Sequence, residues 1–143
     1  MNPTDILART LHAEAACCAL RGVEALAALV LRRARMAMAC DEARLRFAQG
    51  TLAHDMPAMI VAVCRAPFQF GCWRPGGAAW VAGPENAHLA MCRRVAARAL
   101  AGALPDMAPG ATHWHNAQSL PGWAVGRMPL AEAGGLALYR LAA

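Results

Sequence analysis

The sequence contains no lysine, and its positive charge comes from arginine alone. Fourteen basic residues, all arginine, stand against nine acidic ones and give a formal net charge of +5. Genomic base composition is the simplest explanation for arginine-only usage. A basic surface nevertheless favours anionic partners such as envelope polymers or nucleic acid. Because no glycine-rich phosphate loop and no nucleic-acid-binding motif accompanies the charge, we do not expect a nucleic-acid partner.

The sequence also lacks a long hydrophobic run, although 58% of its residues are hydrophobic. The run from Ala25 to Leu31 is closed by Arg32 and Arg33 and is far shorter than the roughly 18 residues that a membrane span requires. The first residues, MNPTDILART, have no basic region followed by an apolar core, so they do not resemble a signal peptide. We therefore expect no membrane span, and an unknown delivery route if the protein acts outside the cytoplasm.

Neither repeats nor a regular cysteine pattern divide the chain. Its 143 residues contain no internal repeat and no linker, which predicts a single domain over residues 1–143. Six irregularly spaced cysteines match neither a zinc ribbon nor a disulfide scaffold, so most are expected to be small core residues. Cys64 and Cys72 flank an aromatic loop and are the pair predicted to bond if the protein works in an oxidising compartment. No cofactor is expected.

Apolar periodicity predicts a mainly helical chain. Helices are expected over residues 4–18, 23–35, 41–49, 55–64 and 84–101, with Asn2 or Thr4 as the first cap and Gly22 as the break between the first two. After Pro109 the segments ATHWHNA, WAVGRMPL and GLALYRL are short and either alternate or are rich in aromatics, which predicts strands. The predicted fold class is α+β, mainly α, with a small C-terminal antiparallel β-sheet.

Glu14 is unusual because it interrupts an apolar helix face. Leu7, Leu11, Glu14 and Cys18 follow the spacing that places side chains on one side of a helix. A buried charge is costly unless it is paired, so one interpretation is a structural glutamate satisfied by Arg21 or by backbone donors. The other is a general acid, because a carboxyl group in an apolar pocket has a raised pKa and can donate a proton at neutral pH.

A second candidate is the loop CRAPFQFGCW, residues 64–73. Sugars bind to aromatic faces beside groups that both donate and accept hydrogen bonds, and Gln69, Phe70 and Trp73 offer both. The alternative is a hydrophobic loop packed on the core, which is the simpler interpretation for the phenylalanines.

The segment THWHN, residues 112–116, places two histidines on one side of a predicted strand. His113 and His115 would share a face, with Trp114 on the other. No third ligand stands at an expected spacing, so no metal is predicted there. A Cys72 thiol with His113 or His115 as its base remains a possible peptidase or amidase pair.

Five segments in the same order resemble the cell wall hydrolase family named for SleB, the spore cortex-lytic enzyme. LARTLHAEA is similar to the family's LAR-hydrophobic-x-x-E-A opening, and GVEALAALVLRRAR is similar to the helix that follows it. CRAPFQFGCW resembles C-x-x-P-x-Q-F-S-C-W, ATHWHN resembles A-T-x-Y-H, and PGWAVGRMPLAEAGGLALYRL resembles the closing P-x-W…G-x-H-x-F-Y. Three positions depart from the family pattern: Arg32 replaces Asn, Gly71 replaces Ser, and Leu136 replaces the closing His.

The resemblance implies a lysozyme-like helical domain that cuts the glycan strands of peptidoglycan as a lytic transglycosylase, with Glu14 as the catalytic acid. No second acid occupies a matched position, which fits a one-carboxylate reaction in which the sugar's own C6 hydroxyl attacks the anomeric carbon. We expect the substrate-binding residues to line one cleft with Glu14; they are Gln69, Phe70, Trp73, His115, Asn116 and Trp123.

Two other functions remain open from the sequence. One is the Cys/His-dependent envelope peptidase or amidase described above. The other is a non-catalytic peptidoglycan-binding module, such as a component of a phage-like or envelope assembly. In each case the expected place of action is the cell envelope or periplasm, or a particle that reaches it.

Overall fold

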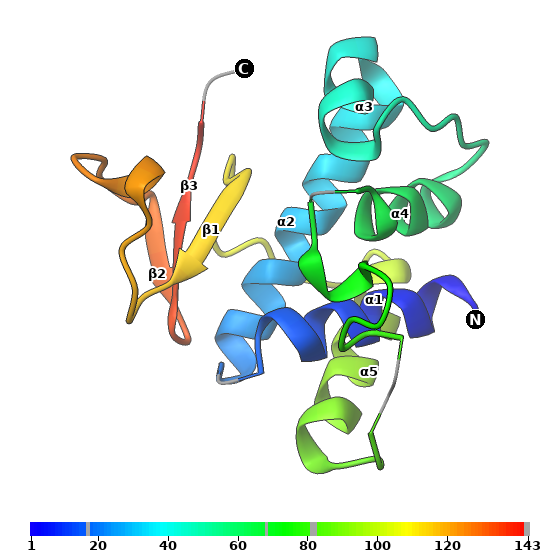
Figure 1. Cartoon of the computed structure of the whole chain (residues 1–143), viewed down its shortest axis with the longest axis horizontal. Coiled ribbons are helices and arrows are strands. Elements are labelled where there is room, and N and C mark those ends of the chain that lie inside the picture. The colour runs from blue at the N-terminus through cyan, green and yellow to red at the C-terminus, as the bar shows by residue number, and fades with distance from the viewer. Residues whose placement is uncertain (17, 68, 81–82, 142–143) are drawn as a thin grey trace.

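The computed structural model describes residues 1–16, 18–67, 69–80 and 83–141, and these form a helical body with a small sheet beside it (Figure 1). The helices of this part of the chain are α1 (Pro3–Glu14), α2 (Leu20–Ala39), α3 (Asp41–Ala48), α4 (Met56–Arg65) and α5 (Ala87–Leu100). The strands are β1 (His113–Asn116), β2 (Ala131–Ala133) and β3 (Leu136–Tyr139). The predicted fold class, mainly α with a small C-terminal antiparallel sheet, is confirmed.

Side-chain caps fix the starts of three helices. The Asn2 carboxamide accepts from the backbone N–H of Asp5 at the start of α1, as one of the two predicted caps. Asp55 accepts from the N–H of Ala58 at the start of α4. Asn86 caps α5, so this helix begins at Ala87, three residues later than the start predicted at Pro84.

The connection between α1 and α2 differs from the prediction in both helices. α1 ends at Glu14 and not at Cys18, and Leu20 already begins α2, so Gly22 lies inside this helix. A Cβ atom on Gly22 would lie 2.7 Å from the carbonyl oxygen of Gly134, in the turn between β2 and β3. Glycine at this position therefore allows the sheet to approach α2 closely; it does not break the helix.

α2 is the central helix of the body and lies between the sheet and the other helices (Figure 1). Most of its residues are buried, from Gly22 to Leu31 without a gap. This explains its low polar content, because a helix with neighbours on several sides has little surface to hydrate. None of the helices in the described part of the chain is long and apolar enough to cross a membrane.

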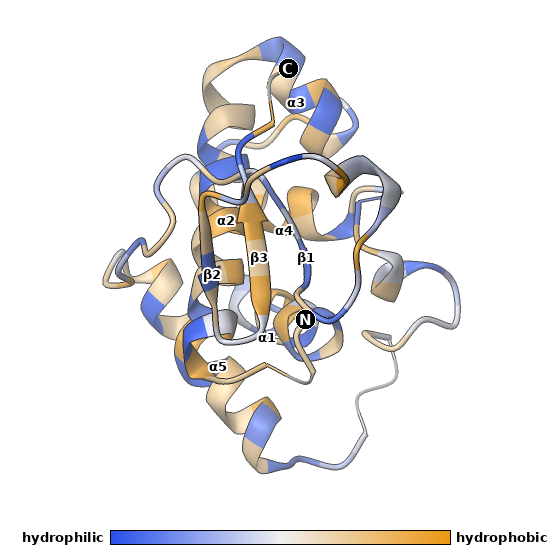
Figure 2. Ribbon diagram, turned by 90° about the vertical axis from the view of Figure 1, so that its left-hand side faces the viewer, coloured by the Kyte–Doolittle hydropathy of each residue, from blue (hydrophilic) through white to orange (hydrophobic). Residues whose placement is uncertain are grey.

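The sheet has the order β1-β3-β2, with β3 in the middle and both pairings antiparallel. Gly134 and Gly135, both at positive φ, form the two-residue turn between β2 and β3. The hydrophobic β3 stands out between its more polar neighbours in Figure 2. Leu136 and Leu138 face the helical core, whereas Ala137 and Tyr139 pack in a separate cluster with Ala124.

One predicted strand was wrong. WAVGRMPL contains a short 3-10 helix, η2 (Gly122–Ala124), and no strand, and β2 comes later at Ala131–Ala133. The alternating pattern reflects a loop that covers the outer side of the sheet, where Ala124 is buried and Trp123 and Val125 are exposed.

Candidate active site

Glu14 is the last residue of α1, and its side chain is partly buried. A carboxylate at the C-terminal end of a helix faces the unpaired carbonyl groups there, which is unfavourable by about 0.3–1 kcal/mol. No arginine forms an ion pair with Glu14 among the described residues; Arg21, the predicted structural partner, is exposed and contacts the sulfur of Met107. Glu14 therefore stands at a costly position without a counter-ion.

Glu14 instead has a backbone donor, the other partner that the structural interpretation allowed, and it comes from the 3-10 helix η1 (Gly71–Trp73). The backbone N–H of Cys72 donates a long hydrogen bond of 3.4 Å to Glu14 Oε1. Burial raises the pKa of the Cys72 thiol far above its ordinary value, and the charge of Glu14 and a hydrogen bond to it raise this pKa further. The loop thus holds the carboxylate through a backbone donor, and no cation from the described part of the chain pairs with it.

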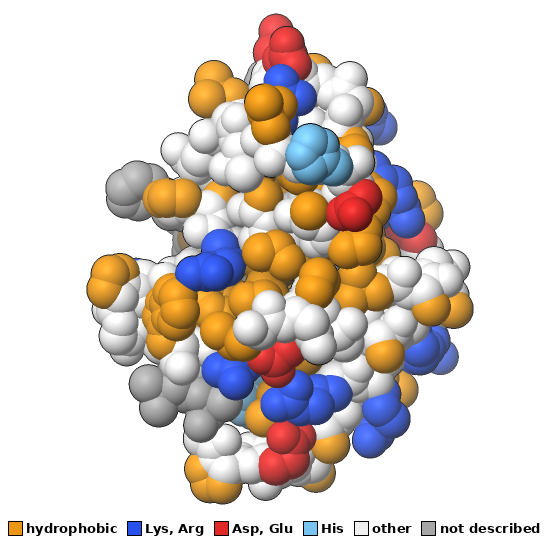
Figure 3. Space-filling view, turned by 90° about the vertical axis from the view of Figure 1, so that its right-hand side faces the viewer, with side chains coloured by type: hydrophobic (Ala, Val, Ile, Leu, Met, Phe, Trp, Pro, Cys, Tyr) orange, Lys and Arg blue, Asp and Glu red, His pale blue; other side chains and the backbone are white. Residues whose placement is uncertain are grey.

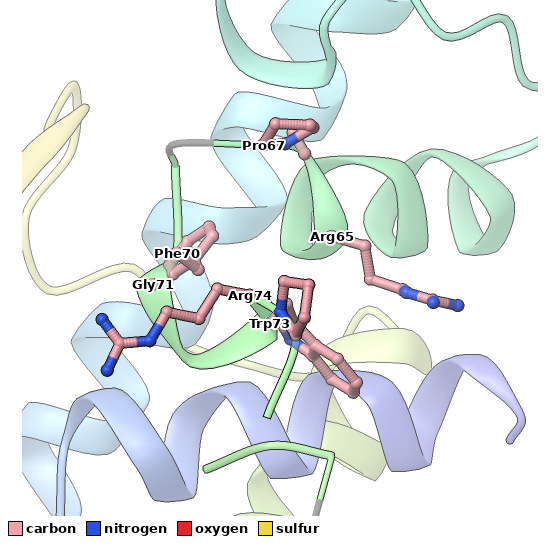
Figure 4. A pocket seen from close by; sticks show the side chains of 8 residues that line it. Arg65, Pro67, Phe70, Gly71, Trp73 and Arg74 are labelled. Atoms are coloured by element: carbon pink, nitrogen blue, oxygen red, sulfur yellow. The ribbon is translucent and has the colours of Figure 1, made fainter. Parts of the chain in front are cut away.

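A cavity of about 460 Å³ adjoins this turn. It lies between the end of α4 and η1, with α1 running below the loop (Figure 4). Its wall is made by the apolar rings of Phe70 and Trp73, by Pro67 and Pro75, and by the side chains of Arg65 and Arg74 together with Ala66 and Gly71. Two of the predicted site residues, Phe70 and Trp73, therefore lie on one cavity wall, directly beside the residue that contacts Glu14.

Trp73 is fixed by a polar contact in the core. Its indole Nε1 donates to Thr10 Oγ1 at 2.8 Å, and the Thr10 hydroxyl in turn donates to the carbonyl of Ile6. Trp73 and Thr10 are both buried, so this contact anchors η1 to α1, the helix that carries Glu14. Trp80 packs edge-on against Trp73 and remains 41% exposed, with the Arg65 guanidinium 4.7 Å from its ring centroid.

Gln69 has both ends of its amide engaged within the protein. Its Oε1 accepts from Arg33 at 3.1 Å, and its Nε2 donates to the carbonyl of Arg46 at 3.0 Å. The buried Arg33 also donates to the carbonyl of Thr112, and burial together with the charge of Arg46 lowers its pKa to about 10. Gln69 therefore connects the loop to α2 and α3, and its amide has little capacity left for a ligand.

Arg33 is surrounded by aromatic rings that come from three parts of the chain. Its guanidinium carbon lies 4.7 Å from the ring centroid of Phe47, 5.4 Å from that of Trp114 and 5.8 Å from that of Phe70. Phe70 and Trp114 also stack on each other at 5.3 Å. These contacts join the loop, α3 and β1 around one buried cation.

His115 and Trp123 form a second group on the outer side of the sheet. As predicted, Trp114 points to the opposite side of β1 from His115, where it packs against the helical core and stacks on Phe70. His115 Nε2 lies 2.8 Å from the hydroxyl of Tyr139, and the Trp123 ring packs edge-on against both. A cavity of about 430 Å³ is lined by His115, Tyr139, Arg127 and the turn after β1. The side chain of Asn116 accepts from the N–H of Gln118 within that turn. The six predicted residues thus do not form one cluster around Glu14.

The predicted pair of Cys72 with His113 or His115 is not assembled among the described residues. Cys72 contacts Glu14, and the hydrogen-bond partners of the imidazoles are other groups: Thr112 for His113, and Tyr139 and Asn116 for His115. A thiol with a strongly raised pKa is a poor nucleophile. The pKa of the Cys64 thiol is likewise raised by burial, to about 12. Cys64 and Cys72 are free thiols here, so the predicted disulfide is not formed in the structure.

The other carboxylates have partners of their own or lie at the surface. Those that pair with arginine are Asp5, Glu24, Asp41, Glu85 and Asp106. Asp55 caps α4, and Glu42 and Glu132 are exposed. The Asp106 pair explains one departure from the family pattern, because Arg32 binds Asp106 and also donates to the carbonyl of Ala111 at 2.7 Å.

The fold and the sequence each match known proteins. The catalytic domain of the Bacillus cereus SleB protein, known from a crystal structure, matches with a TM-score of 0.65 over 97% of this chain and 90% of that chain, at 17% identity. The likeness shows that the chain has a lysozyme-like, mainly helical fold. The sequence profile of cell wall hydrolases matches residues 19–137, so the chain belongs to the cell wall hydrolase family. This match begins after Glu14. Comparison with curated proteins finds no match.

Two features of this region escaped the sequence interpretation. Trp80 is an exposed aromatic beside Trp73, and Arg65 and Arg74 place two cations on the cavity wall. Their only sequence signal was proximity to the loop. Figure 3 shows the face that is turned to the right in Figure 1. Hydrophobic side chains cross the middle of this face and arginines lie beside them, so the face combines apolar and positively charged side chains as the cavity wall does.

Proposed function

We propose that this protein cleaves the glycan strands of peptidoglycan and that Glu14 is its general acid and base. The observation that carries the proposal is a partly buried carboxylate at the end of α1 that has no counter-ion among the described residues. It accepts a hydrogen bond from the N–H of Cys72, beside a cavity with aromatic walls. Membership of the cell wall hydrolase family supports the substrate class. The proposed place of action is the cell envelope, where this polymer is found.

In the proposed reaction, Glu14 donates its proton to the glycosidic oxygen as the bond from that oxygen to the anomeric carbon of muramic acid breaks. Positive charge develops on the sugar ring, and the carboxylate formed at Glu14 lies close to it. The C6 hydroxyl of the same sugar then attacks the anomeric carbon, and its proton passes to Glu14. The enzyme returns to its starting state, and the product carries a 1,6-anhydro ring.

The distribution of acids supports this transglycosylase route over hydrolysis. A retaining or inverting hydrolase uses two carboxyl groups that flank the scissile bond. Here five of the other eight acids are held by arginines and one caps a helix. An internal hydroxyl needs no second carboxylate to orient it, because it is already held beside the reacting carbon.

The cavity beside η1 is proposed to hold sugar rings of the strand. Phe70 and Trp73, both largely buried, form its apolar wall, while Arg65 and Arg74 can pair with the carboxylates of the peptide stems. Trp80 adds an exposed aromatic surface next to Trp73. The outer side of the sheet, with His115, Asn116 and Trp123, is proposed as a second contact region for a long polymer.

Mass spectrometry of fragments released from purified sacculi tests the proposal. We expect soluble muropeptides that end in 1,6-anhydro-muramic acid. Fragments with a reducing muramic acid, heavier by one water, would show hydrolysis instead. Cleavage within the peptide stems would indicate a peptidase or amidase. Binding to sacculi without release of fragments would show a non-catalytic module.

A further inference from the structure

His12, His88 and Cys92 form a cluster that the proposed reaction does not use. His12 lies on α1, and His88 and Cys92 lie four residues apart on α5, so the last two share one helix face. One potential ligand atom from each residue lies within 4.8 Å of the others. The three side chains thus meet where α1 packs against α5.

The distances within the cluster are close to those of a metal site. His12 Nδ1 and His88 Nδ1 are 2.8 Å apart, and Cys92 Sγ is 3.7 Å from His88 Nδ1. In tetrahedral zinc sites, Zn–N distances of about 2.0–2.1 Å and a Zn–S distance of about 2.3 Å place neighbouring ligand atoms roughly 3.3–3.6 Å apart. Small side-chain adjustments are therefore sufficient to centre an ion between the three atoms.

The hydrogen bonds of the cluster are incomplete without a further group. His88 Nδ1 is approached by both His12 and Cys92, while the buried His88 Nε2 has no hydrogen-bond partner among the described residues. If Nδ1 of His88 is the acceptor, two groups compete for its one lone pair and the Nε2–H is unpaired; if it is the donor, the Nε2 lone pair is unpaired. Neither tautomer satisfies the ring, and such a group calls for an explanation.

We propose that His12, His88 and Cys92 bind a divalent transition-metal ion, with zinc as the best chemical match. Two imidazole nitrogens and one thiolate are a donor set that zinc favours, and three protein ligands leave a fourth position for water. His12 also lines a cavity of about 280 Å³ with Arg9, Ala13 and Leu89, which provides room for that water.

The ion would act as a structural clamp between α1 and α5, separate from the proposed reaction. Positions 12 and 14 are two residues apart on a helix of 3.6 residues per turn, so their side chains leave α1 in nearly opposite directions. Binding at His12 therefore fixes α1 without occupying the space at Glu14. A clamp of this kind stabilises the folded state by an amount that grows with the logarithm of the free-ion concentration, because the unfolded chain does not hold the three ligands together.

Metal titration of the full chain tests this site. After treatment with a chelator and dialysis, we expect one zinc ion per chain in calorimetry, release of protons on binding, and a rise in Tm. Cobalt(II) in place of zinc is expected to give the charge-transfer absorption of a thiolate ligand. Because binding is measured directly, this result does not depend on whether the protein cleaves peptidoglycan.

Matched variants assign the ligands. Cys92→Ser, His88→Gln and His12→Gln should each weaken zinc binding by about tenfold or more, and Cys92→Ser should abolish the cobalt–thiolate absorption. Cys40→Ser and His54→Gln, which change an exposed cysteine and an exposed histidine, serve as controls and should leave binding unchanged. The proposal is wrong if the folded wild-type chain binds no zinc, or if binding persists in His12→Gln and Cys92→Ser.

Discussion

The carboxylate of Glu14 accepts a hydrogen bond from the backbone N–H of Cys72, a residue 58 positions later in the chain. The contact joins the end of α1 to the turn η1, where Phe70 and Trp73 form one wall of a cavity. A backbone donor is kept by every substitution except proline and carries no full charge. It therefore orients the carboxylate without committing it to an ion pair, which is what proton transfer to a substrate requires.

Replacing Glu14 by glutamine tests its proposed role directly. We expect Glu14→Gln to reduce release of fragments from purified sacculi by about 10²–10⁴-fold, because the amide cannot donate and recover a proton. The free energy of unfolding should change by less than about 1 kcal/mol, since the Cys72 N–H can still donate to the amide oxygen. Glu42→Gln, at an exposed position on α3, is the matched control. Undiminished activity in Glu14→Gln would remove Glu14 from the mechanism.

A Cys/His mechanism would require a reactive thiol at Cys72. Since burial and Glu14 raise the pKa of this thiol, we expect Cys72→Ser to retain lytic activity and the native protein to resist inactivation by N-ethylmaleimide. Serine keeps the backbone donor and a hydroxyl that can reach Glu14. Loss of activity in step with alkylation of Cys72 would instead support a Cys/His enzyme.

The close approach of Gly22 and Gly134 predicts a large effect of one methyl group. A Cβ on Gly22 would lie 2.7 Å from Gly134 O, and one on Gly134 would lie 2.2 Å from Gly22 N. Gly22→Ala should stabilise α2 by about 1 kcal/mol through higher helix propensity, but the added methyl group would crowd Gly134 and destabilise the protein by about 1–3 kcal/mol. We therefore expect a net loss of stability. Gly134→Ala should cost more, because Gly134 also has a φ of 53°.

Urea unfolding of these variants measures the difference. Gly122→Ala is the control, because a Cβ there would meet no atom within 4 Å. Equal stability of Gly22→Ala and Gly122→Ala would mean that the sheet can move away from α2 without cost.

Thr10 should be needed to hold the loop. Thr10→Val keeps the shape of the side chain but leaves the buried Trp73 Nε1–H without its acceptor, which should cost about 1–3 kcal/mol. Thermal unfolding of Thr10→Val beside Thr51→Val, at an exposed position, isolates this contact. If the two variants unfold at the same temperature, the indole finds another partner and Thr10 does not anchor η1.

His113 should make stability depend on pH in the mildly acidic range. Burial, followed by the charges of Arg33, Arg46 and Arg127, lowers its pKa from 6.5 to about 4. As the pH falls below 6.5 the unfolded chain takes up a proton that the folded chain refuses, so stability is lost down to about pH 4 and the loss then levels off. Because the ring is only half buried, solvent screening limits the effect to roughly 1–2 kcal/mol.

The measurement compares wild type with His113→Gln in chemical unfolding at pH 7 and pH 4.5. The variant should lose less stability over this interval than the wild type. His54→Gln, at an exposed position, should behave as the wild type does. A wild-type loss no greater than that of His113→Gln would mean that neither burial nor the nearby arginines lower the pKa of His113.

Local patterns predicted much of the fold because their causes are local. The Asn2 cap, the five helices and the opposite directions of His113 and Trp114 follow from capping chemistry and from the two periodicities of 3.6 and 2. The errors came where a distant segment decides. The sequence pattern predicts a helix break at Gly22, because the true constraint on this residue, the turn at Gly134, lies more than a hundred residues away.

The residues of the candidate site show the same difference between local and distant causes. Glu14 was singled out because a carboxylate on an apolar helix face is anomalous in any fold. Gln69 was expected to face a ligand, but Arg33 and Arg46 occupy its amide. His12, His88 and Cys92 were not recognised, because 76 residues separate the two histidines.

The sequence by itself determined the mainly helical class, the family and the anomaly at Glu14, since these depend on residue types and on spacing within one element. Only the tertiary structure decided that Cys72 meets Glu14, that His115 and Trp123 lie on the outer side of the sheet, and that α1 and α5 bring two histidines and a cysteine together. Such contacts depend on how helices and strands pack, and packing is set by the combined shape of many buried side chains and not by any one segment.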